Sequence, residues 1–137
     1  MHHVLCISHS TDVDGLASAA LVKIATKAEV KLVDYCNFIE ALKDVTDASE
    51  LYLCDLGLSP ETASLFFDEL KRIKKFAKVV YIDHHPKVKG YRYISTTNLR
   101  IIHSLKDCAA ALTYNQFKSS LPKGASILAA YAAITDF

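Results

Sequence analysis

The sequence predicts an α/β fold, namely a doubly wound, mostly parallel five-stranded sheet with helices on both faces. Short apolar segments alternate with segments of helical periodicity along the 137 residues, and no internal repeat or low-complexity segment interrupts them. Strands that alternate with helices in this way are joined by crossovers and run parallel, and a parallel sheet is covered on both faces. The length suits one domain, which we assign to residues 1–137.

The first half of the chain contains three predicted strands. The apolar residues 4–8 form the first strand, and the small residues that follow predict a helix over residues 15–27. Residues 30–35 form the second strand, and Asn37 can cap a short helix after it. Residues 51–54 then form the third strand, which completes a βαβαβ order.

The second half contains two more strands and three helices. The Ser-Pro pair at 59–60 is a strong helix start, and apolar residues at helical spacing continue to Phe76. Residues 78–82 form the fourth strand. The fifth lies either at residues 91–94, within a polar and basic loop, or at residues 100–103, just after it. Two final helices are predicted over residues 108–118 and 126–137.

Composition and charge exclude several classes of protein. The 16 basic and 15 acidic residues give a net charge of +1, so the overall charge does not favour a strong nucleic-acid or membrane binder. No apolar run approaches the length of about 20 residues that spans a bilayer, and the N-terminus lacks the features of a secretory signal. The four cysteines have no paired spacing, which predicts reduced thiols rather than a zinc site. We therefore expect a soluble, cytoplasmic protein.

Acidic and histidine side chains follow three of the predicted strands. In an open α/β sheet the carboxyl ends of neighbouring strands open into one crevice, so these side chains are expected to converge. Any one of them could instead be a helix cap or a turn former, but the whole set predicts a metal site. The residues are His9, Asp12 and Asp14 after the first strand, Asp55 after the third, and Asp83, His84 and His85 after the fourth.

The ligand types indicate which ions would bind and what they would do. Carboxylates with a minority of imidazoles suit Mn²⁺ or Mg²⁺, and Mn²⁺ is the first choice because it accepts both ligand types. Asp12 and Asp14 are two residues apart, so in extended backbone they would face the same way and hold two ions, with Asp55 as a bridge. Two such ions activate a bridging water and stabilise the oxygens at phosphorus, so the predicted reaction is phosphoester hydrolysis.

Four other residues admit two interpretations each. Gly15 lacks a Cβ, which would let a phosphate approach the N-terminus of the first helix, but a tight strand-to-helix turn would explain it equally well. Lys87 and Arg92 follow the histidine pair and could contact a phosphate or simply be solvated. His103 has no matching partner in the pattern and is predicted to be solvated or satisfied within the core.

The chain resembles the DHH phosphoesterase superfamily, which is named after the sequence at residues 83–85. That superfamily includes RecJ-type exonucleases, oligoribonucleases, cyclic dinucleotide phosphodiesterases, exopolyphosphatases and type II inorganic pyrophosphatases. The matching segments occur in the family's order and cover essentially the whole chain. They are SHSTDVDGLASAAL, CDLGLSP, YIDHHP, a looser DCAAALTY and a final AAITDF.

The resemblance implies a two-metal site. By position, His9, Asp12 and Asp55 would hold one ion, and Asp14, Asp55, His84 and Asp136 the other. It also implies that His85 contacts the phosphate and that Asp83 supports the histidine pair. The family's second domain, which closes the cleft and binds the distal part of the substrate, is expected to be absent from residues 1–137.

The implied function is hydrolysis of phosphodiester bonds in nucleotides or short single-stranded nucleic acid. Two alternatives remain open at this stage. An exopolyphosphatase or inorganic pyrophosphatase would use the same metals on phosphoanhydrides, and a non-catalytic domain could serve as a scaffold in a nucleic-acid complex. The expected partner is a phosphate-ester substrate and not a membrane, and the sequence carries no indication of oligomeric state.

Overall fold

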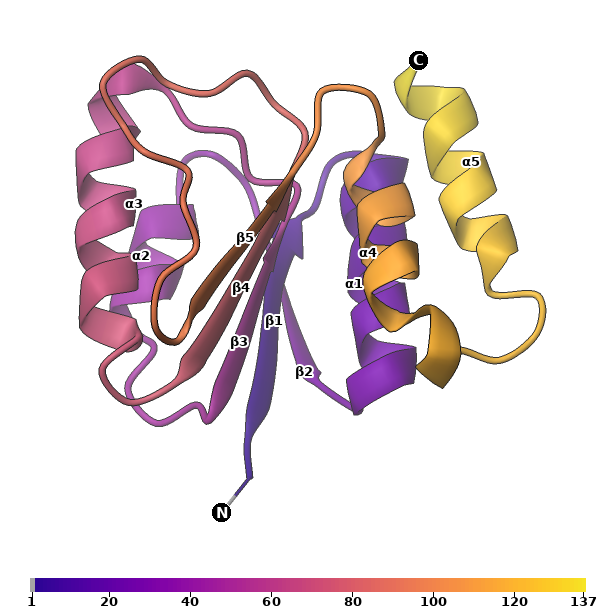
Figure 1. Cartoon of the computed structure of the whole chain (residues 1–137), viewed down its shortest axis with the longest axis horizontal. Helices are drawn as coiled ribbons and strands as arrows, with labels where there is room; N and C mark the ends of the chain where they lie inside the picture. The colour runs from indigo at the N-terminus through magenta and orange to yellow at the C-terminus, as the bar shows by residue number, and fades with distance from the viewer. Residues whose placement is uncertain (1) are drawn as a thin grey trace.

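The computed structural model describes residues 2–137 and contains one five-stranded sheet (Figure 1). All four strand pairings are parallel, and the strand order is β2-β1-β3-β4-β5. The α/β fold with a parallel sheet is therefore confirmed. The strands are β1 (Val4–His9), β2 (Glu29–Val33), β3 (Glu50–Cys54), β4 (Lys78–Asp83) and β5 (Leu99–His103).

Helices cover both faces of this sheet (Figure 1). One face carries α2 (Phe38–Lys43) and α3 (Pro60–Ile73), and the opposite face carries α1 (Val13–Thr26) and α4 (Ala109–Phe117). The last helix, α5 (Ser126–Asp136), packs on α1 and α4 as an outer layer. A short 3₁₀ turn at Lys118–Ser120 follows α4.

Two apolar clusters hold the helices against the two faces of the sheet. Beneath α2 and α3 the fully buried side chains include Ile7, Phe66 and Tyr81, and on the α1 side they include Cys6 and Ile82. Neighbouring residues of one strand, such as Cys6 and Ile7, thus serve opposite faces, because successive side chains alternate across a sheet. Burial on both faces explains why the central strands β1, β3 and β4 read as largely apolar runs.

Three sequence-based expectations about the elements need correction or refinement. The first helix begins at Val13 rather than at residue 15, because Asp12 is its N-cap and accepts a hydrogen bond from the Gly15 N–H at 2.8 Å. The predicted extended segment carrying both Asp12 and Asp14 is therefore wrong, since Asp14 lies in the first helical turn. The helix that starts at the Ser-Pro pair is confirmed, with a capping box, but it ends at Ile73.

The fifth strand is Leu99–His103, and the alternative at residues 91–94 is wrong. Those residues form a loop that packs its aromatic rings against α3 instead of pairing with the sheet. Phe67 of α3 stacks on Tyr91 with ring centroids 5.3 Å apart, and it meets Tyr93 edge-on at 5.4 Å. Tertiary packing of these rings thus overrides the strand propensity of a Tyr-rich segment.

Two further expectations concern membranes and cysteines. Among the described residues, none of the helices has the length and apolar character needed to cross a membrane. All four cysteines are free thiols, and Cys6, Cys54 and Cys108 are buried. The two strand cysteines, Cys6 and Cys54, act as small apolar residues of the core.

Candidate metal centre

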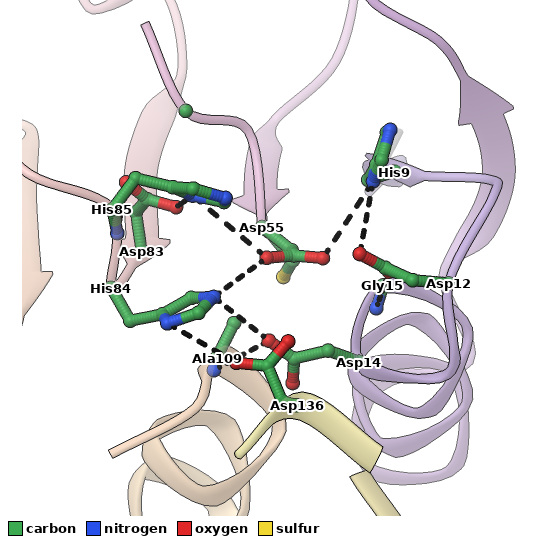
Figure 2. Close-up of polar contacts among 12 residues, drawn as sticks. His9, Asp12, Asp14, Gly15, Asp55, Asp83, His84, His85, Ala109 and Asp136 are labelled. Carbon is green, nitrogen blue, oxygen red and sulfur yellow. Dashed lines mark hydrogen bonds and ion pairs between the residues drawn. The ribbon is translucent and has the colours of Figure 1, made fainter. Parts of the chain in front are cut away.

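The predicted ligands gather at the carboxyl ends of the strands (Figure 2). The chain first runs from β1 outward to β2 and then returns to place β3 on the other side of β1. This reversal creates a topological switch point, where the loops after neighbouring strands separate and leave a crevice. His9 ends β1, Asp55 follows β3, and the histidine pair follows β4, so all three segments meet at that crevice.

Asp55 lies at the centre of the site. It is fully buried and adopts a left-handed conformation with φ 58°, which turns the chain sharply after β3. Its Oδ1 accepts a hydrogen bond from His84 Nε2 at 3.2 Å. Its Oδ2 is buried and has no hydrogen-bond partner among the described residues. A buried carboxylate oxygen without a partner is costly unless a cation completes its surroundings, so the site fits a bound metal ion.

Ligand atoms surround Asp55 on two sides (Figure 2). On one side, His9 Nδ1 lies 3.3 Å from Asp12 Oδ2 and 3.8 Å from Asp55 Oδ2. These three residues offer ligand atoms that all lie within 4.8 Å of one another. A Thr11 hydroxyl, 3.1 Å from His9 Nε2, holds the other edge of the imidazole ring.

The second side is built around His84. Its Nε2 lies 3.2 Å from both Asp14 Oδ2 and Asp55 Oδ1, and its Nδ1 lies 3.5 Å from Asp136 Oδ2 at the end of α5. Asp14, His84 and Asp136 form another group whose ligand atoms lie within 4.8 Å of one another. The structure thus brings together all six residues predicted as metal ligands, from four separate segments (Figure 2). That they bind metal stays a prediction.

The charges in this cluster are strongly coupled. Burial raises the pKa of Asp55 to about 8, although its hydrogen bond with His84 opposes the shift. Hydrogen bonds to Asp14 and Asp55 raise the pKa of His84 to about 10, although burial opposes that shift. In the absence of metal at neutral pH, therefore, the site keeps protons on both Asp55 and His84. A bound divalent cation would replace these protons as the positive charge that offsets the buried carboxylates.

Asp14 has a second role that the sequence did not reveal. Although burial disfavours its charge, hydrogen bonds from His84 and from the backbone of α4 lower its pKa. The N–H groups of Ala109 and Ala110 donate to its two oxygens at 3.0 and 2.8 Å. The N-cap residue Cys108 makes no side-chain capping bond, so a carboxylate from α1 caps α4 across the fold.

Replacing Asp14 with alanine is therefore expected to destabilise the metal-free protein by about 2–4 kcal/mol. The change leaves two buried N–H groups at the start of α4 without an acceptor. Denaturant unfolding in the presence of a chelator measures the loss. Asp136→Ala is the matched control, because that carboxylate also faces His84 but accepts none of these backbone bonds. Equal stability of the two variants would contradict the capping role.

His85 is held in place by three neighbours. Its Nδ1 lies 2.7 Å from Asp83 Oδ1, and its backbone N–H donates to Asp83 Oδ2 at 3.1 Å. His103, to which the sequence assigned no role, donates from Nε2 to the His85 backbone carbonyl at 2.6 Å. The hydrogen bond to Asp83 raises the pKa of His85, although burial opposes the shift. Asp83 thus orients this imidazole and favours its charged form, and His103 holds the backbone that carries it.

Gly57 is the third neighbour of His85. A Cβ at residue 57 would lie 2.6 Å from His85 Cγ and 2.9 Å from its Nδ1. Gly57→Ala is expected to displace the ring, break its bond with Asp83 and return its pKa towards the ordinary value of about 6.5. An NMR titration of the His85 ring would measure this change, with Leu58→Ala as the neighbouring control. An unchanged pKa would show that the ring does not depend on the missing Cβ.

Gly15 is required by packing at the other end of the site. A Cβ there would lie 2.0 Å from the His9 carbonyl oxygen. The Gly15 carbonyl accepts a hydrogen bond from the Ser8 hydroxyl, and the Gly15 N–H donates one to the Asp12 side chain. These contacts support the tight-turn interpretation. The predicted phosphate contact at Gly15 stays a prediction.

The two basic residues predicted at the rim lie along the loop after β4. Lys87 Nζ is 5.6 Å from the centre of the Tyr93 ring, which is a cation–π geometry. Arg92 borders grooves between the loop and α3 together with Phe67 and Lys71. Their roles in substrate binding stay predictions.

Comparison with known proteins identifies the family. The DHH family, N-terminal domain, matches residues 3–134. An uncharacterized protein from Helicobacter pylori G27 has a similar structure, with a TM-score of 0.62 and 19% identity, over 87% of this chain and 36% of that one. An exopolyphosphatase-related protein from Bacteroides fragilis has a TM-score of 0.56 and 13% identity, over 98% of this chain and 45% of that one.

These likenesses differ in what they establish. At such identities the two solved structures show a shared fold, and this chain spans less than half the length of either. No curated protein matches the chain. The family match is different in kind, because it extends over nearly every residue and includes all of the predicted ligands except Asp136, which lies just beyond it. The chain belongs to the DHH family, of which it contains the N-terminal domain.

Proposed function

We propose that this chain is a two-metal phosphoesterase that hydrolyses phosphodiester bonds in nucleotides or short single-stranded nucleic acid. Members of the DHH family are generally metal-dependent phosphoesterases, which supports the class of reaction. The observation that carries the proposal is Asp55, whose carboxylate is buried between two groups of ligand atoms and keeps one oxygen without a hydrogen-bond partner among residues 2–137.

The residues divide naturally between two ions. His9, Asp12 and Asp55 would hold one, and Asp14, Asp55, His84 and Asp136 would hold the other. Mn²⁺ suits this mixture of carboxylates and imidazoles, and Mg²⁺ is the alternative. When bound, the two cations would activate water and stabilise negative charge at phosphorus.

The chain's own residues orient the substrate. Hydrogen bonding to Asp83 raises the pKa of His85, which favours the imidazolium form, and engages its Nδ1. The Nε2–H of the imidazolium can then donate to a phosphoryl oxygen and neutralise charge in the transition state. His103 holds the backbone of His85 and thereby limits movement of the donor. Asp83, which is 2% exposed, thus acts through the ring it positions.

A second candidate is hydrolysis of polyphosphate or pyrophosphate. The structural similarity to an exopolyphosphatase-related protein favours it, and the same metals would act on a phosphoanhydride. The ligands themselves do not distinguish the two bonds, since both reactions place a phosphoryl group between the ions. A third candidate, a non-catalytic scaffold in a nucleic-acid complex, predicts no hydrolysis with either metal.

A substrate panel tests the proposal. The 137-residue chain is incubated with Mn²⁺ or Mg²⁺ and a generic phosphodiester, a dinucleotide, pyrophosphate or polyphosphate. We expect hydrolysis of the phosphodiesters, its loss in His84→Ala, and normal activity in His3→Ala. His3 is a suitable control because it pairs with Glu29 at the end of the sheet where β1 and β2 begin, away from the metal centre. Hydrolysis of the anhydrides alone would favour the second candidate, and no hydrolysis at all would favour the scaffold.

A further inference from the structure

We propose that a cleft beside the metal centre binds the nucleobase of the substrate, an inference that rests on the proposed function and narrows it to nucleotides. This base cleft has a volume of about 460 Å³, within the range of roughly 300–1,000 Å³ that is usual for small-molecule sites. It lies between the segment after β2, the start of α3 and the histidine pair. Its walls include Tyr35, Phe38, Leu58, Thr62, His85 and Pro86.

The base cleft is continuous with the metal centre. His85, the proposed phosphate contact, forms part of its wall. Tyr35, which also lines the cleft, packs against His9 with ring centroids 4.7 Å apart. A molecule in the cleft would therefore contact His85 directly and would contact the Tyr35 ring that packs on His9, and both histidines belong to groups of potential ligands that include Asp55. A nucleotide whose phosphate lies at that cluster would place its adjoining sugar and base at the mouth of this cleft.

The chemistry of the walls selects a flat, uncharged ring. Most of the lining is aromatic or aliphatic, and among its lining residues the one group that can carry a positive charge is His85, the proposed phosphate contact. Tyr35 keeps 47% of its surface exposed although Phe38 packs edge-on against it at 6.0 Å. Exposed aromatic surface of this kind binds bases by stacking, which tolerates different sequences. A chain of phosphates would instead need cations to offset its charge and would gain nothing from apolar walls.

Few polar groups in the cleft are free for hydrogen bonding. The hydroxyls of Ser59 and Thr62 bond each other and the backbone within the capping box of α3. The Tyr35 hydroxyl accepts a long bond from the Gly57 N–H at 3.4 Å and keeps its own hydrogen for a ligand. The cleft therefore recognises shape and aromatic surface, and we expect little discrimination among the bases.

Binding of mononucleotides provides the first test, and it does not depend on turnover. The Mg²⁺-loaded protein is titrated with adenosine 5′-monophosphate and, separately, with ribose 5-phosphate, and amide shifts are followed by NMR. We expect the base-containing probe to shift Gly57, Leu58 and Thr62 and to bind about tenfold or more tightly than ribose 5-phosphate. Equal affinities, or shifts confined to residues outside the cleft, would overturn the inference.

A variant that fills the cleft provides the second test. Leu58→Trp is expected to reduce the preference for a dinucleotide over a base-free ribose phosphodiester by about tenfold. Leu65→Trp is the matched control, because Leu65 is 49% exposed on α3 and does not line the cleft. An unchanged preference in a folded Leu58→Trp protein would count against the base cleft.

The two tests separate this inference from the proposed function. If neither phosphodiester is hydrolysed but adenosine 5′-monophosphate still shifts the cleft amides, the phosphoesterase assignment fails and the base cleft stands. If phosphodiesters are hydrolysed equally well with and without a base, the phosphoesterase stands and the base cleft is wrong.

Discussion

Replacing Asp55 with asparagine is expected to abolish metal binding and to lower phosphodiester hydrolysis by more than about 100-fold. The carboxylate belongs to the group with His9 and Asp12, and its Oδ1 lies 3.2 Å from His84 of the second group, so its loss affects both proposed ions. Asparagine has the same shape and also tolerates a left-handed backbone, which Asp55 adopts at φ 58°. Isothermal titration with Mn²⁺ and the hydrolysis assay measure the two effects.

The same substitution is expected to leave the metal-free fold as stable as the wild type or more stable, by about 1–3 kcal/mol at pH 7. Burial raises the pKa of Asp55 to about 8 from the ordinary value of 3.8. A carboxyl group whose pKa is higher in the folded than in the unfolded state stabilises the fold fully when the pH is below its unfolded-state pKa. This stabilisation is lost as the pH rises through its folded-state pKa. Asparagine does not ionise and therefore escapes this loss. Thermal unfolding in a chelator measures the difference.

Asp47→Asn is the matched control for both measurements. Its side chain is 85% exposed, and it faces His3 at the opposite edge of the sheet from the site. We expect its metal affinity, activity and stability to match the wild type. If Asp55→Asn kept Mn²⁺ binding and hydrolysis, Asp55 would not be the bridging ligand and the two-metal assignment would be wrong.

Mn²⁺ affinity is expected to rise with pH between about 6 and 9, by roughly tenfold or more per pH unit at neutral pH. In the metal-free protein, burial raises the pKa of Asp55 to about 8, and hydrogen bonds to Asp14 and Asp55 raise that of His84 to about 10. Both groups are thus largely protonated at pH 7. A cation must displace these protons, roughly two for the complete site, before their atoms can coordinate it.

Stability of the metal-free protein is expected to change in the opposite direction. His84 contributes stability that is present below its unfolded pKa of 6.5 and is lost as the pH rises towards 10. The contribution of Asp55 likewise falls as the pH rises through about 8. Thermal midpoints in a chelator should therefore decrease from pH 6 to 9, while the increase produced by Mn²⁺ becomes larger.

Calorimetry in buffers with different ionisation enthalpies measures the released protons directly. Proton release that diminishes above pH 8 would agree with ionisation of Asp55. Metal affinity that does not change across this range would show that the ion does not displace protons from Asp55 and His84. It would also show that the protons on Asp55 and His84 do not occupy the place of a bound cation.

Much of the fold could be predicted from the sequence, because its signals are local. Buried parallel strands read as short apolar runs, and the Ser59–Pro60 capping pair marks the start of a helix. The convergence of Asp55 and His84 also followed from the sequence, since the ends of parallel strands share one edge of the sheet. The small residues after Asp14 place the start of α1 too late, because the Asp12 side chain caps the helix before that run begins.

Other features depend on contacts between residues that are distant in the sequence, and only the tertiary structure decided them. Asp14 caps α4 across 95 residues, and His103 holds the His85 carbonyl across 18. The chain turns at Asp55 into a left-handed conformation, and His85 packs where Gly57 lacks a Cβ. The strand at residues 99–103 was selected over 91–94 because aromatic rings of the latter segment pack on α3.

The sequence by itself determined which residue types reach the strand ends, and hence the family and the class of site. The tertiary structure determined which atoms of those residues remain without partners. That division has a physical reason. Periodicity and capping depend on neighbours within a few residues, whereas burial, hydrogen-bond satisfaction and pKa depend on every segment packed around a group, and those segments come together only in the folded chain.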